Sequence, residues 1–393
     1  MKHLKNNSSN ITKVAVMTFH MASNYGAMLQ AYALQKTIDN MEGVECEILD
    51  YRQHFIYKRD GIYRFNELIL DSGALKGSAR FIWRHLEGRY RNITSAQKKF
   101  DDFLRNDQEC SQKVYFKKEK LKKTSYDVVV FGSDQIWNPN LIGGFSPEYL
   151  GGGFDTNKTS LVAYAASCGT GHLPEEYQNQ YIYYLRRFSA ISVREKSLAN
   201  TLNEDWHISV QTTLDPVLLA KPAIWEPLIK QAEIHVNEPY LLIYSFDAGD
   251  EIYKVALKVA QVKHLKPIAI CYKKQNISPE IEQILDCGPK DFLSLISHAE
   301  FVCTTSFHGL AFSILFGKQF YCMPHPLVGQ RERDLIDLLG LNDRFLEHSE
   351  DLINITDGDY SEAQKRLEDL RESSLRFLED AIWNKGREDE PNS

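Results

Sequence analysis

The segment Ala299–Cys322, AEFVCTTSFHGLAFSILFGKQFYC, constrains the fold most, because it contains a complete strand–loop–helix–strand unit. Glu300–Thr304 is short and apolar, as a buried strand is, and Leu310–Phe316 is an apolar helix of about two turns. Gly317 ends this helix, and Gln319–Met323 follows as the next strand. Such a unit is typical of a parallel sheet covered by helices.

The same alternation recurs along the chain and predicts an α/β protein with two doubly wound parallel sheets. The expected strands are Val14–His20, Glu45–Tyr51, Asp127–Phe131, Ser160–Ala166, Ala190–Val193, Tyr240–Phe246, Pro267–Cys271, Glu300–Thr304 and Gln319–Met323. The expected helices are Ala27–Asp39, Pro174–Arg187, Lys196–Leu202, Asp250–His264, Pro289–His298, Leu310–Phe316, Arg331–Leu339 and Glu362–Trp383.

Two α/β domains of similar size fit this pattern. The boundary between the two domains is expected at Leu214-Asp215-Pro216-Val217. We therefore expect one domain over 12–215 and a second over 216–360. The remaining residues, 361–393, are expected to form a C-terminal helix followed by a polar tail. If the two domains face each other, the carboxyl ends of both sets of strands line a cleft between them.

The segment 55–123 differs from the rest of the chain in amino-acid composition and is interpreted as an insert in the first domain. Basic and aromatic residues alternate there, namely Tyr57, Lys58, Arg59, Tyr63, Arg64, Phe65, Arg80, Phe81, Trp83, Arg84, Arg89, Tyr90 and Arg91. Cations beside aromatic faces suit sugars or lipid phosphates at a membrane surface. The alternative is a helical hairpin whose aromatic side chains form a core and whose arginines are solvated.

Composition excludes several classes of protein. The net charge of −7 at pH 7 argues against a general nucleic-acid-binding protein. No run of eighteen apolar residues exists, and the polar N-terminus lacks an apolar signal core, so we expect neither a membrane span nor secretion. The seven cysteines are odd in number and no two have metal-ligand spacing. We therefore expect a reducing, cytoplasmic location and no metal site.

Polar residues directly after predicted strands are the candidate site residues. His308 and Gly309 lie where a helix starts, next to hydroxyls and free backbone amides, which together suit an anion. The alternative for His308 is a buried histidine that caps the helix. Asn24 and Gly26 follow the first strand, and Gly26 allows close approach of a ligand or of a neighbouring helix. A turn that merely requires Asn and Gly explains them equally well.

Three further candidates follow strands of the first domain. Ser133 and Asp134 follow strand Asp127–Phe131, and Asp134 is a candidate base or sugar-hydroxyl acceptor, with helix capping as the alternative. Arg194 emerges from strand Ala190–Val193, where it needs an anionic partner. That partner is either a ligand or a carboxylate of the protein, such as Glu195.

Read together, these motifs resemble the polysaccharide pyruvyl transferase family. The matching stretches are Ser23-Asn24-Tyr25-Gly26-Ala27, Gly132-Ser133-Asp134-Gln135-Ile136-Trp137, Ser192-Val193-Arg194-Glu195, Leu214-Asp215-Pro216-Val217, Phe292–Ser313, and Arg331 ahead of Gly340-Leu341. Their order and spacing cover most of residues 14–341. The basic insert and the C-terminal tail lie outside the resemblance.

The resemblance implies a GT-B-like pair of Rossmann-like domains, with the helix Glu362–Trp383 packing back on the first domain. It implies transfer of the pyruvyl group of phosphoenolpyruvate to a sugar of a polysaccharide or its precursor, forming a cyclic ketal, in bacterial surface-glycan biosynthesis. The implied donor-binding residues are Arg194, Ser306, Gly309 and Arg331, with His308 as a catalytic residue. Some family members have Arg-Leu-His where this chain has Ser306-Phe307-His308, so one expected cation is absent, and Arg331 is a candidate to replace it.

The residue types suit this chemistry. Phosphoenolpyruvate carries a carboxylate and a phosphate and therefore needs fixed cations and amide donors. Histidine, with a reference pKa of about 6.5, suits a general acid that protonates the methylene carbon. We expect His308 at the mouth of the cleft as this acid, facing Arg194, and Asp134 as the weaker candidate base. Asn24, Gly26 and Ser133 are expected to form loops near the substrate, and no cofactor or metal is required.

Two other functions remain open. One is a GT-B glycosyltransferase that uses a nucleotide sugar, and the other is a non-catalytic glycan-binding protein of the same fold. The expected partners are phosphoenolpyruvate and a sugar or lipid-linked glycan acceptor, with no nucleic acid. A lipid-linked acceptor would place the protein at the inner face of the membrane, with the insert 55–123 contacting acceptor or membrane surface.

Overall fold

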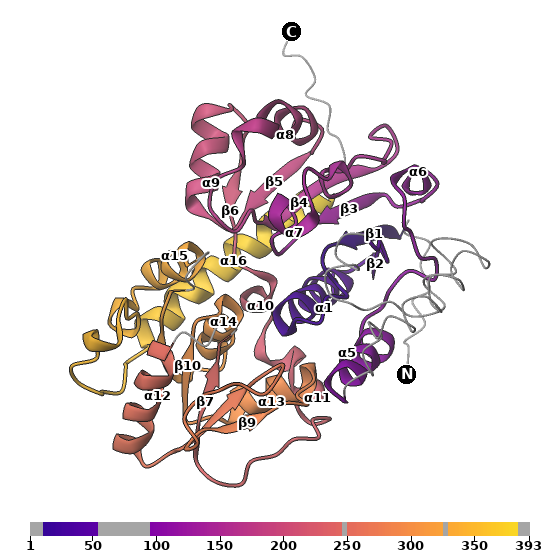
Figure 1. Ribbon diagram of the computed structural model, residues 1–393. Helices are drawn as coiled ribbons and strands as arrows, with labels where there is room; N and C mark the ends of the chain where they lie inside the picture. The colour runs from indigo at the N-terminus through magenta and orange to yellow at the C-terminus, as the bar shows by residue number, and fades with distance from the viewer. Residues whose placement is uncertain (1–10, 54–94, 246–249, 325–328, 384–393) are drawn as a thin grey trace, which may run out of the picture.

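The computed structural model describes residues 11–53, 95–245, 250–324 and 329–383. The chain forms two parallel sheets with helices packed around them (Figure 1). The predicted α/β class with two Rossmann-like sheets is therefore confirmed. Most of the basic and aromatic residues of the predicted insert, including Arg84, Arg89 and Arg91, lie outside the described residues.

The first sheet has six strands in the described part of the chain, in the order β2-β1-β3-β4-β5-β6. The strands are β1 Thr12–Met17, β2 Val44–Ile48, β3 Val128–Phe131, β4 Ser160–Ala166, β5 Ala190–Val193 and β6 Gln211–Thr212. The accompanying helices are α1 Tyr25–Asp39, α5 Ser95–Asn106, α6 Lys118–Leu121, α7 Pro139–Ile142, α8 Gln178–Leu185 and α9 Lys196–Asn200. Every residue of β3 is buried, as expected of a parallel strand covered on both faces.

The second sheet has five strands in the described residues, in the order β11-β10-β7-β8-β9. The strands are β7 Tyr240–Tyr244, β8 Lys266–Ile270, β9 Glu282–Ile284, β10 Phe301–Thr304 and β11 Gln319–Cys322. The α-helices that follow β6 along the chain are α10 Pro216–Leu219, α11 Glu226–Ile229, α12 Asp250–Lys263, α13 Pro289–His298, α14 Phe307–Leu315, α15 Gln330–Leu339 and α16 Ser361–Trp383.

Each sheet has one place where the strand order reverses. In the first sheet this place lies between β1 and β3, and in the second it lies between β7 and β10. Loops leave such a pair of neighbouring strands in opposite directions, which leaves room for a ligand at their carboxyl ends. The candidate residues Asn24, Asp134 and His308 follow β1, β3 and β10, so they come from these two places.

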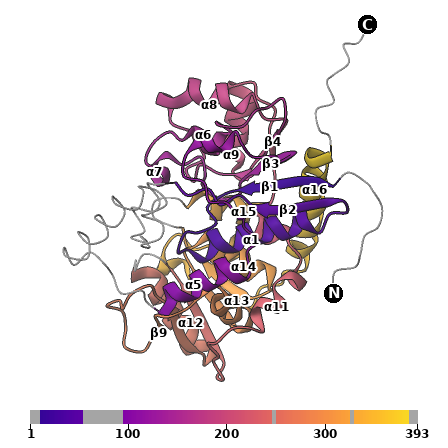
Figure 2. The same cartoon turned by 90° about the vertical axis from the view of Figure 1, so that its right-hand side faces the viewer.

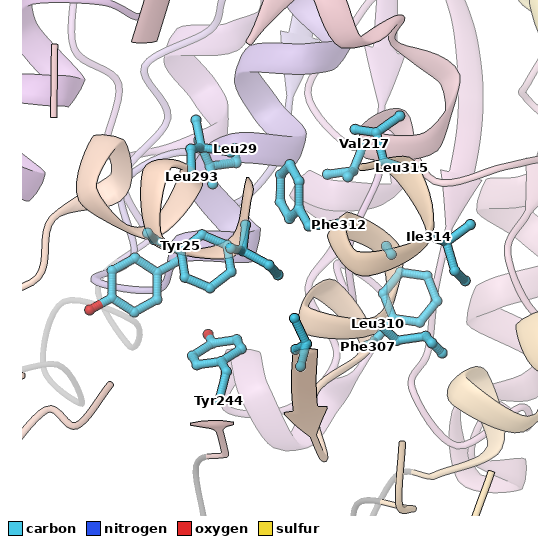
Figure 3. Close-up of a cluster of buried hydrophobic side chains, with 14 of the residues drawn as sticks. Tyr25, Leu29, Val217, Tyr244, Leu293, Phe307, Leu310, Phe312, Ile314 and Leu315 are labelled. Atoms are coloured by element: carbon cyan, nitrogen blue, oxygen red, sulfur yellow. The ribbon is translucent and has the colours of Figure 1, made fainter. Parts of the chain in front are cut away.

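A shared apolar cluster joins the helices of the two sheets. Tyr25 and Leu29 of α1, Val217 of α10 and Phe307 and Phe312 of α14 all belong to it (Figure 3). The ring of Tyr25 stacks on Phe292 of α13 at 4.9 Å, and its hydroxyl donates to the carbonyl oxygen of Cys287 at 3.0 Å. Burial of this apolar surface is the main force that holds the two sheets in one arrangement.

Helix α5, the described end of the predicted insert, lies beside α13 of the second half (Figures 1 and 2). Lys99 Nζ donates to Asp291 Oδ2 at 2.8 Å, and Lys290 Nζ lies 2.8 Å from Asp107 Oδ2. Phe100 and Phe103 are buried in the shared apolar cluster. This part of the insert therefore helps to join the two halves of the chain.

The long helix α16 runs back across the molecule (Figure 1). It contacts α15, α10 and β4, and Leu378 and Ile382 are buried against residues of the first sheet. The Arg371 guanidinium donates from Nε to the carbonyl oxygen of Leu218 at 2.9 Å. Within the described ranges, no helix is both long and apolar enough to cross a membrane.

Several predicted element boundaries differ from the structure. Strand β1 ends at Met17, and His20 lies in the following loop, where its Nε2 is 3.2 Å from Asp50 Oδ1. Gly26 is the second residue of α1 and not a loop residue, because Asn24 caps the helix by accepting from the Ala27 N–H. The predicted helix Pro174–Arg187 is reduced to a 3₁₀ turn followed by α8.

Candidate functional site

Polar and charged side chains from both sheets meet beside α10. Arg194 follows β5, Asp215 is the N-cap of α10, and His308 is the second residue of α14. Arg194 Nη1 donates to Asp215 Oδ2 at 2.5 Å, and His308 Nε2 lies 3.8 Å from the same oxygen. The carboxylate of Asp215 thus lies between the candidate donor-binding arginine and the candidate catalytic histidine.

The imidazole of His308 is buried and only 7% of the residue is exposed. The expectation that it lies at the mouth of a cleft is therefore wrong for this structure. It does not cap α14 either, because Ser306 occupies the N-cap position. Its Nε2 has no hydrogen-bond partner among the described residues. An unpartnered buried ring nitrogen is costly, so it marks a position where a ligand would supply the missing partner.

Gly26 and Gly309 make this packing possible. A Cβ at Gly26 would lie 2.0 Å from Nδ1 of His308, and a Cβ at Gly309 would lie 2.3 Å from Oγ1 of Thr304. Glycine is therefore required at both positions for close approach rather than for a positive φ. Asn24, the N-cap of α1, is half-buried and holds the helix end that meets the imidazole.

Two guanidiniums flank the ring of Phe307. Arg194 lies 4.6 Å and Arg331 lies 5.4 Å from the ring centroid, distances at which a cation and an aromatic face attract. Arg331 comes from α15 of the second half, so the two cations approach from different sheets. Among the described residues, Nε and Nη2 of Arg194 and Nε of Arg331 are buried without hydrogen-bond partners. This arrangement is suited to an anionic ligand.

Asp134 and Gln135 complete this group of side chains. Asp134 has a φ of 68°, a conformation that Asp tolerates better than most residues, and its Oδ1 accepts from the Gln135 N–H at 2.8 Å. The same oxygen lies 3.8 Å from Nη2 of Arg194. The Gln135 amide also lies beside Arg331, and with its oxygen and nitrogen exchanged its oxygen would accept from Nη2 at 3.2 Å and from Nη1 at 3.3 Å.

Ser133 is fully buried and binds groups of the protein. Its hydroxyl donates to the carbonyl oxygen of Ala165 at 2.8 Å and lies 3.2 Å from Asp215 Oδ2. Its N–H donates to Gln30 Oε1 at 3.2 Å, and its carbonyl oxygen accepts from the Thr18 hydroxyl. Ser133 therefore contacts Asp215 and other groups of the protein.

The charges around His308 act in opposite directions on its pKa. Burial lowers the pKa, and the guanidiniums of Arg194 and Arg331 lower it further. The carboxylates of Asp215 and Asp134 raise it, but the pKa remains below the usual value for histidine. His308 is therefore neutral at pH 7 in the absence of a ligand. An anion that binds close to Nε2 would raise this pKa and favour the protonated ring.

The buried charges of Arg194 and Asp215 support each other. Burial alone would lower the pKa of Arg194, but Asp215, Glu195 and Asp134 outweigh burial and raise it. Burial alone would raise the pKa of Asp215, but His308, Arg194 and the Val217 N–H outweigh burial and lower it. Both side chains are therefore charged in the folded protein.

A family model described as polysaccharide pyruvyl transferase matches residues 24–326, which include every residue of this site except Arg331. The chain belongs to the polysaccharide pyruvyl transferase family. This is a family of enzymes, and the match spans both sheets. A search of curated proteins finds no match to this pyruvyl transferase family member.

Solved structures with a similar chain course include enzymes of sugar-nucleotide chemistry. UDP-GlcNAc 2-epimerase from Neisseria meningitidis, bound to UDP-GlcNAc, is 10% identical over 95% of this chain and 95% of its own, with a TM-score of 0.45. The Methanocaldococcus jannaschii UDP-GlcNAc 2-epimerase is 12% identical over 91% of this chain and 99% of its own, with a TM-score of 0.42. Escherichia coli ADP-heptose lps heptosyltransferase II is 10% identical over 94% of this chain and 100% of its own, with a TM-score of 0.37.

The structure brings the predicted site residues of this pyruvyl transferase family member into one region. Ser306 is the N-cap of α14, Gly309 is the third residue of this helix, and the Arg331 guanidinium lies 5.4 Å from the ring centroid of Phe307. Sequence reasoning did not assign a role to Asp215, although an Asp before Pro at a helix start is a recognisable N-cap.

Glu332 was also missed. Only 1% of this residue is exposed, and burial raises the pKa of its carboxyl despite the opposing charge of Arg331. Leu335, Ile336 and Leu339 follow it at helical spacing on the buried face of α15. That spacing is the signal that could have placed Glu332 inside the protein.

Proposed function

We propose that this protein transfers the pyruvyl group of phosphoenolpyruvate to a sugar of a surface polysaccharide or of its precursor, forming a pyruvate ketal. The observation that carries the proposal is the pair Arg194 and Arg331, which flank Phe307 with unpartnered N–H groups beside Nε2 of His308. Phosphoenolpyruvate has two anionic groups, a carboxylate and a phosphate, separated by one carbon. Two guanidiniums within 6 Å of the centroid of one aromatic ring suit such a ligand.

In the proposed reaction, Nε2 of His308 gives its proton to the methylene carbon of phosphoenolpyruvate, which becomes a methyl group. One sugar hydroxyl oxygen bonds to the central carbon, the bond from that carbon to the phosphate oxygen breaks, and a second hydroxyl oxygen takes the vacated position. The two hydroxyl protons return to His308 and to the released phosphate. Asp134, close to Arg194, is the proposed base that takes the second hydroxyl proton and passes it to the released phosphate.

The proposal needs neither a metal nor a cofactor, since fixed cations and one imidazole supply the charge stabilisation and the proton. The acceptor is proposed to be a sugar or a lipid-linked glycan, handled in the cytoplasm at the inner face of the membrane. The basic and aromatic segment within 55–123 is proposed to contact that acceptor or the membrane surface. If charge reversal at Arg84, Arg89 and Arg91 changes neither acceptor affinity nor liposome binding, this role for the segment is wrong.

The first test is ligand-induced stabilisation of the full chain. Phosphoenolpyruvate at about 100 times its Kd should stabilise the protein by about 2.7 kcal/mol, measured as a rise in melting temperature. Arg331→Ala should lose most of this rise. UDP-sugars serve as the comparison, and stabilisation by a UDP-sugar without any response to phosphoenolpyruvate would favour a nucleotide-sugar glycosyltransferase.

The second test concerns the product. Glycan intermediates from cells with and without the gene, analysed by mass spectrometry, should differ by the mass of an added pyruvyl ketal. His308→Gln should abolish the added mass. Binding of phosphoenolpyruvate with no pyruvylated glycan and no release of phosphate from any acceptor fraction would instead indicate a non-catalytic glycan-binding protein.

A further inference from the structure

Asp215 occupies an unusual position between the two sheets. It is the last residue before α10, which contacts α1, α14 and α16, so it lies where the chain passes from the first sheet to the second (Figure 1). Only 1% of the residue is exposed. Its Oδ1 accepts from the Val217 N–H at 3.0 Å, which fixes the carboxylate to the start of α10.

The other oxygen, Oδ2, faces side chains from both halves of the protein. It lies 2.5 Å from Arg194 Nη1 and 3.2 Å from Ser133 Oγ, both from the first half. It lies 3.8 Å from His308 Nε2, which comes from the second half. A carboxylate that is anchored through one oxygen can hold its other oxygen in a fixed position, so its charge is directed at these groups.

We infer that Asp215 is the positioning residue of the proposed reaction, because it orients Arg194 for the donor and directs a fixed negative charge at Nε2 of His308. This inference rests on the proposed function. The bond from Nη1 leaves Nε and Nη2 of Arg194 without hydrogen-bond partners among the described residues, and these are the N–H groups available to an anion. The charge at 3.8 Å favours the imidazolium form that the proton transfer requires.

Asp215 is not the only charge that faces His308. Asp134 from the loop after β3 also favours the imidazolium, whereas Arg194 after β5 and Arg331 on α15 oppose it. The segment of α1 that packs on the ring contributes Gly26 and no charged side chain at the contact. Of the two carboxylates, Asp215 is the one with an oxygen within 4 Å of a ring nitrogen of His308. Its removal should therefore have the largest effect on His308.

The test measures the ionisation of His308 in the full chain without any ligand. Histidine-labelled protein is titrated by NMR, and His308→Gln identifies the resonance. Asp215→Asn retains an oxygen for the Val217 N–H but removes the charge, so the pKa of His308 should fall by about one to three pH units. Asp134→Asn is the matched control, since it removes a more distant carboxylate and should have a smaller effect.

An unchanged or raised pKa of His308 in Asp215→Asn would overturn the inference, and so would an equal fall in Asp134→Asn. If Asp215→Asn does not fold, the variant Asp215→Glu tests the inference instead. Glu keeps the charge but displaces it by one methylene, so the pKa of His308 should remain within about one pH unit of the wild-type value. At the same time, the affinity for phosphoenolpyruvate should fall at least about tenfold, because Arg194 is turned away. Wild-type values of both quantities in Asp215→Glu would contradict the inference.

The two proposals can fail separately. The NMR titration needs no substrate, so it tests the effect of Asp215 on His308 whether or not phosphoenolpyruvate is the donor. Isothermal titration with phosphoenolpyruvate tests the donor. If wild-type protein does not bind phosphoenolpyruvate but the Asp215→Asn shift is found, the proposed function fails while the link between Asp215 and His308 stands.

Discussion

The imidazole of His308 lies directly against the backbone of Gly26, so that a Cβ at position 26 would come within 2.0 Å of Nδ1. The two residues are far apart in the sequence and belong to helices of different sheets, α14 and α1. This contact sets the distance between the two helix starts at the site. The site therefore depends on how closely the two sheets pack.

Gly26→Ala should displace the imidazole and lower both stability and turnover. Overpacking of a buried contact costs about 1–3 kcal/mol, measurable by urea unfolding. The double variant Gly26→Ala with His308→Ala is the control, since removal of the ring leaves room for the methyl group. It should be more stable than Gly26→Ala alone but remain inactive. Equal losses in both variants would show that the methyl group meets something other than the ring.

Binding of phosphoenolpyruvate should take up protons at pH 7. His308 is neutral in the empty protein because its pKa is lowered by burial and by Arg194 and Arg331, and an anion near Nε2 reverses that balance. The measurement is isothermal titration in buffers with different heats of ionisation. The uptake should approach one proton in wild-type protein and vanish in His308→Gln. An enthalpy that does not depend on the buffer would contradict this.

Arg331→Ala should weaken binding of phosphoenolpyruvate by about 10- to 100-fold, the loss expected for a charged hydrogen bond of about 1.5–3 kcal/mol. Arg333 on the same helix provides the matched control. Its guanidinium lies 4.0 Å from the ring of Phe345 and its side chain is 34% exposed. Arg333→Ala should leave the affinity unchanged. If both variants bind phosphoenolpyruvate equally well, Arg331 does not replace the missing cation.

The stability of the empty protein should depend on His308 between pH 5 and 7. Its folded pKa is lowered, so the unfolded chain takes up the proton first as pH falls below about 6.5. The contribution of His308 is therefore complete above that pH and is lost as pH falls through the folded pKa. The free energy of unfolding of wild type minus that of His308→Gln should decrease from pH 7 to pH 5. A difference that is constant over this range would exclude the lowered pKa.

The contact between α5 and α13 should contribute more to stability than an exposed ion pair. Lys99 binds Asp291, a buried carboxylate that also accepts from the N–H groups of Glu233, Ile234 and Gly288. Lys99→Met should lower the free energy of unfolding by about 1–3 kcal/mol. The control Lys36→Met removes a pair with Glu109, which is 59% exposed, and should cost at most about 1 kcal/mol. Equal losses would mean that burial of Asp291 has no effect.

The strand–loop–helix alternation was predictable because it is a local pattern. The buried strands β3 and β10 were recognised from their apolar runs within one residue of their observed bounds. The short strands β6 and β9 were missed because runs of two and three residues have no measurable periodicity. Helix α5 was assigned to the insert, but no sequence pattern could show that Lys99 binds Asp291 across 192 residues.

The sequence by itself determined which residues lie at the carboxyl ends of strands, since apolar runs and the polar residues that follow them are set by neighbours along the chain. Only the tertiary structure decided that Arg194, Asp215 and His308 meet, that the imidazole is buried, and that Arg331 lies on Phe307. These contacts depend on the strand order and on the packing of α1, α10 and α14, which are set by burial of apolar surface shared between distant segments. The ionisation of His308 follows from those same contacts, because it depends on charges that come from elements far apart in the sequence.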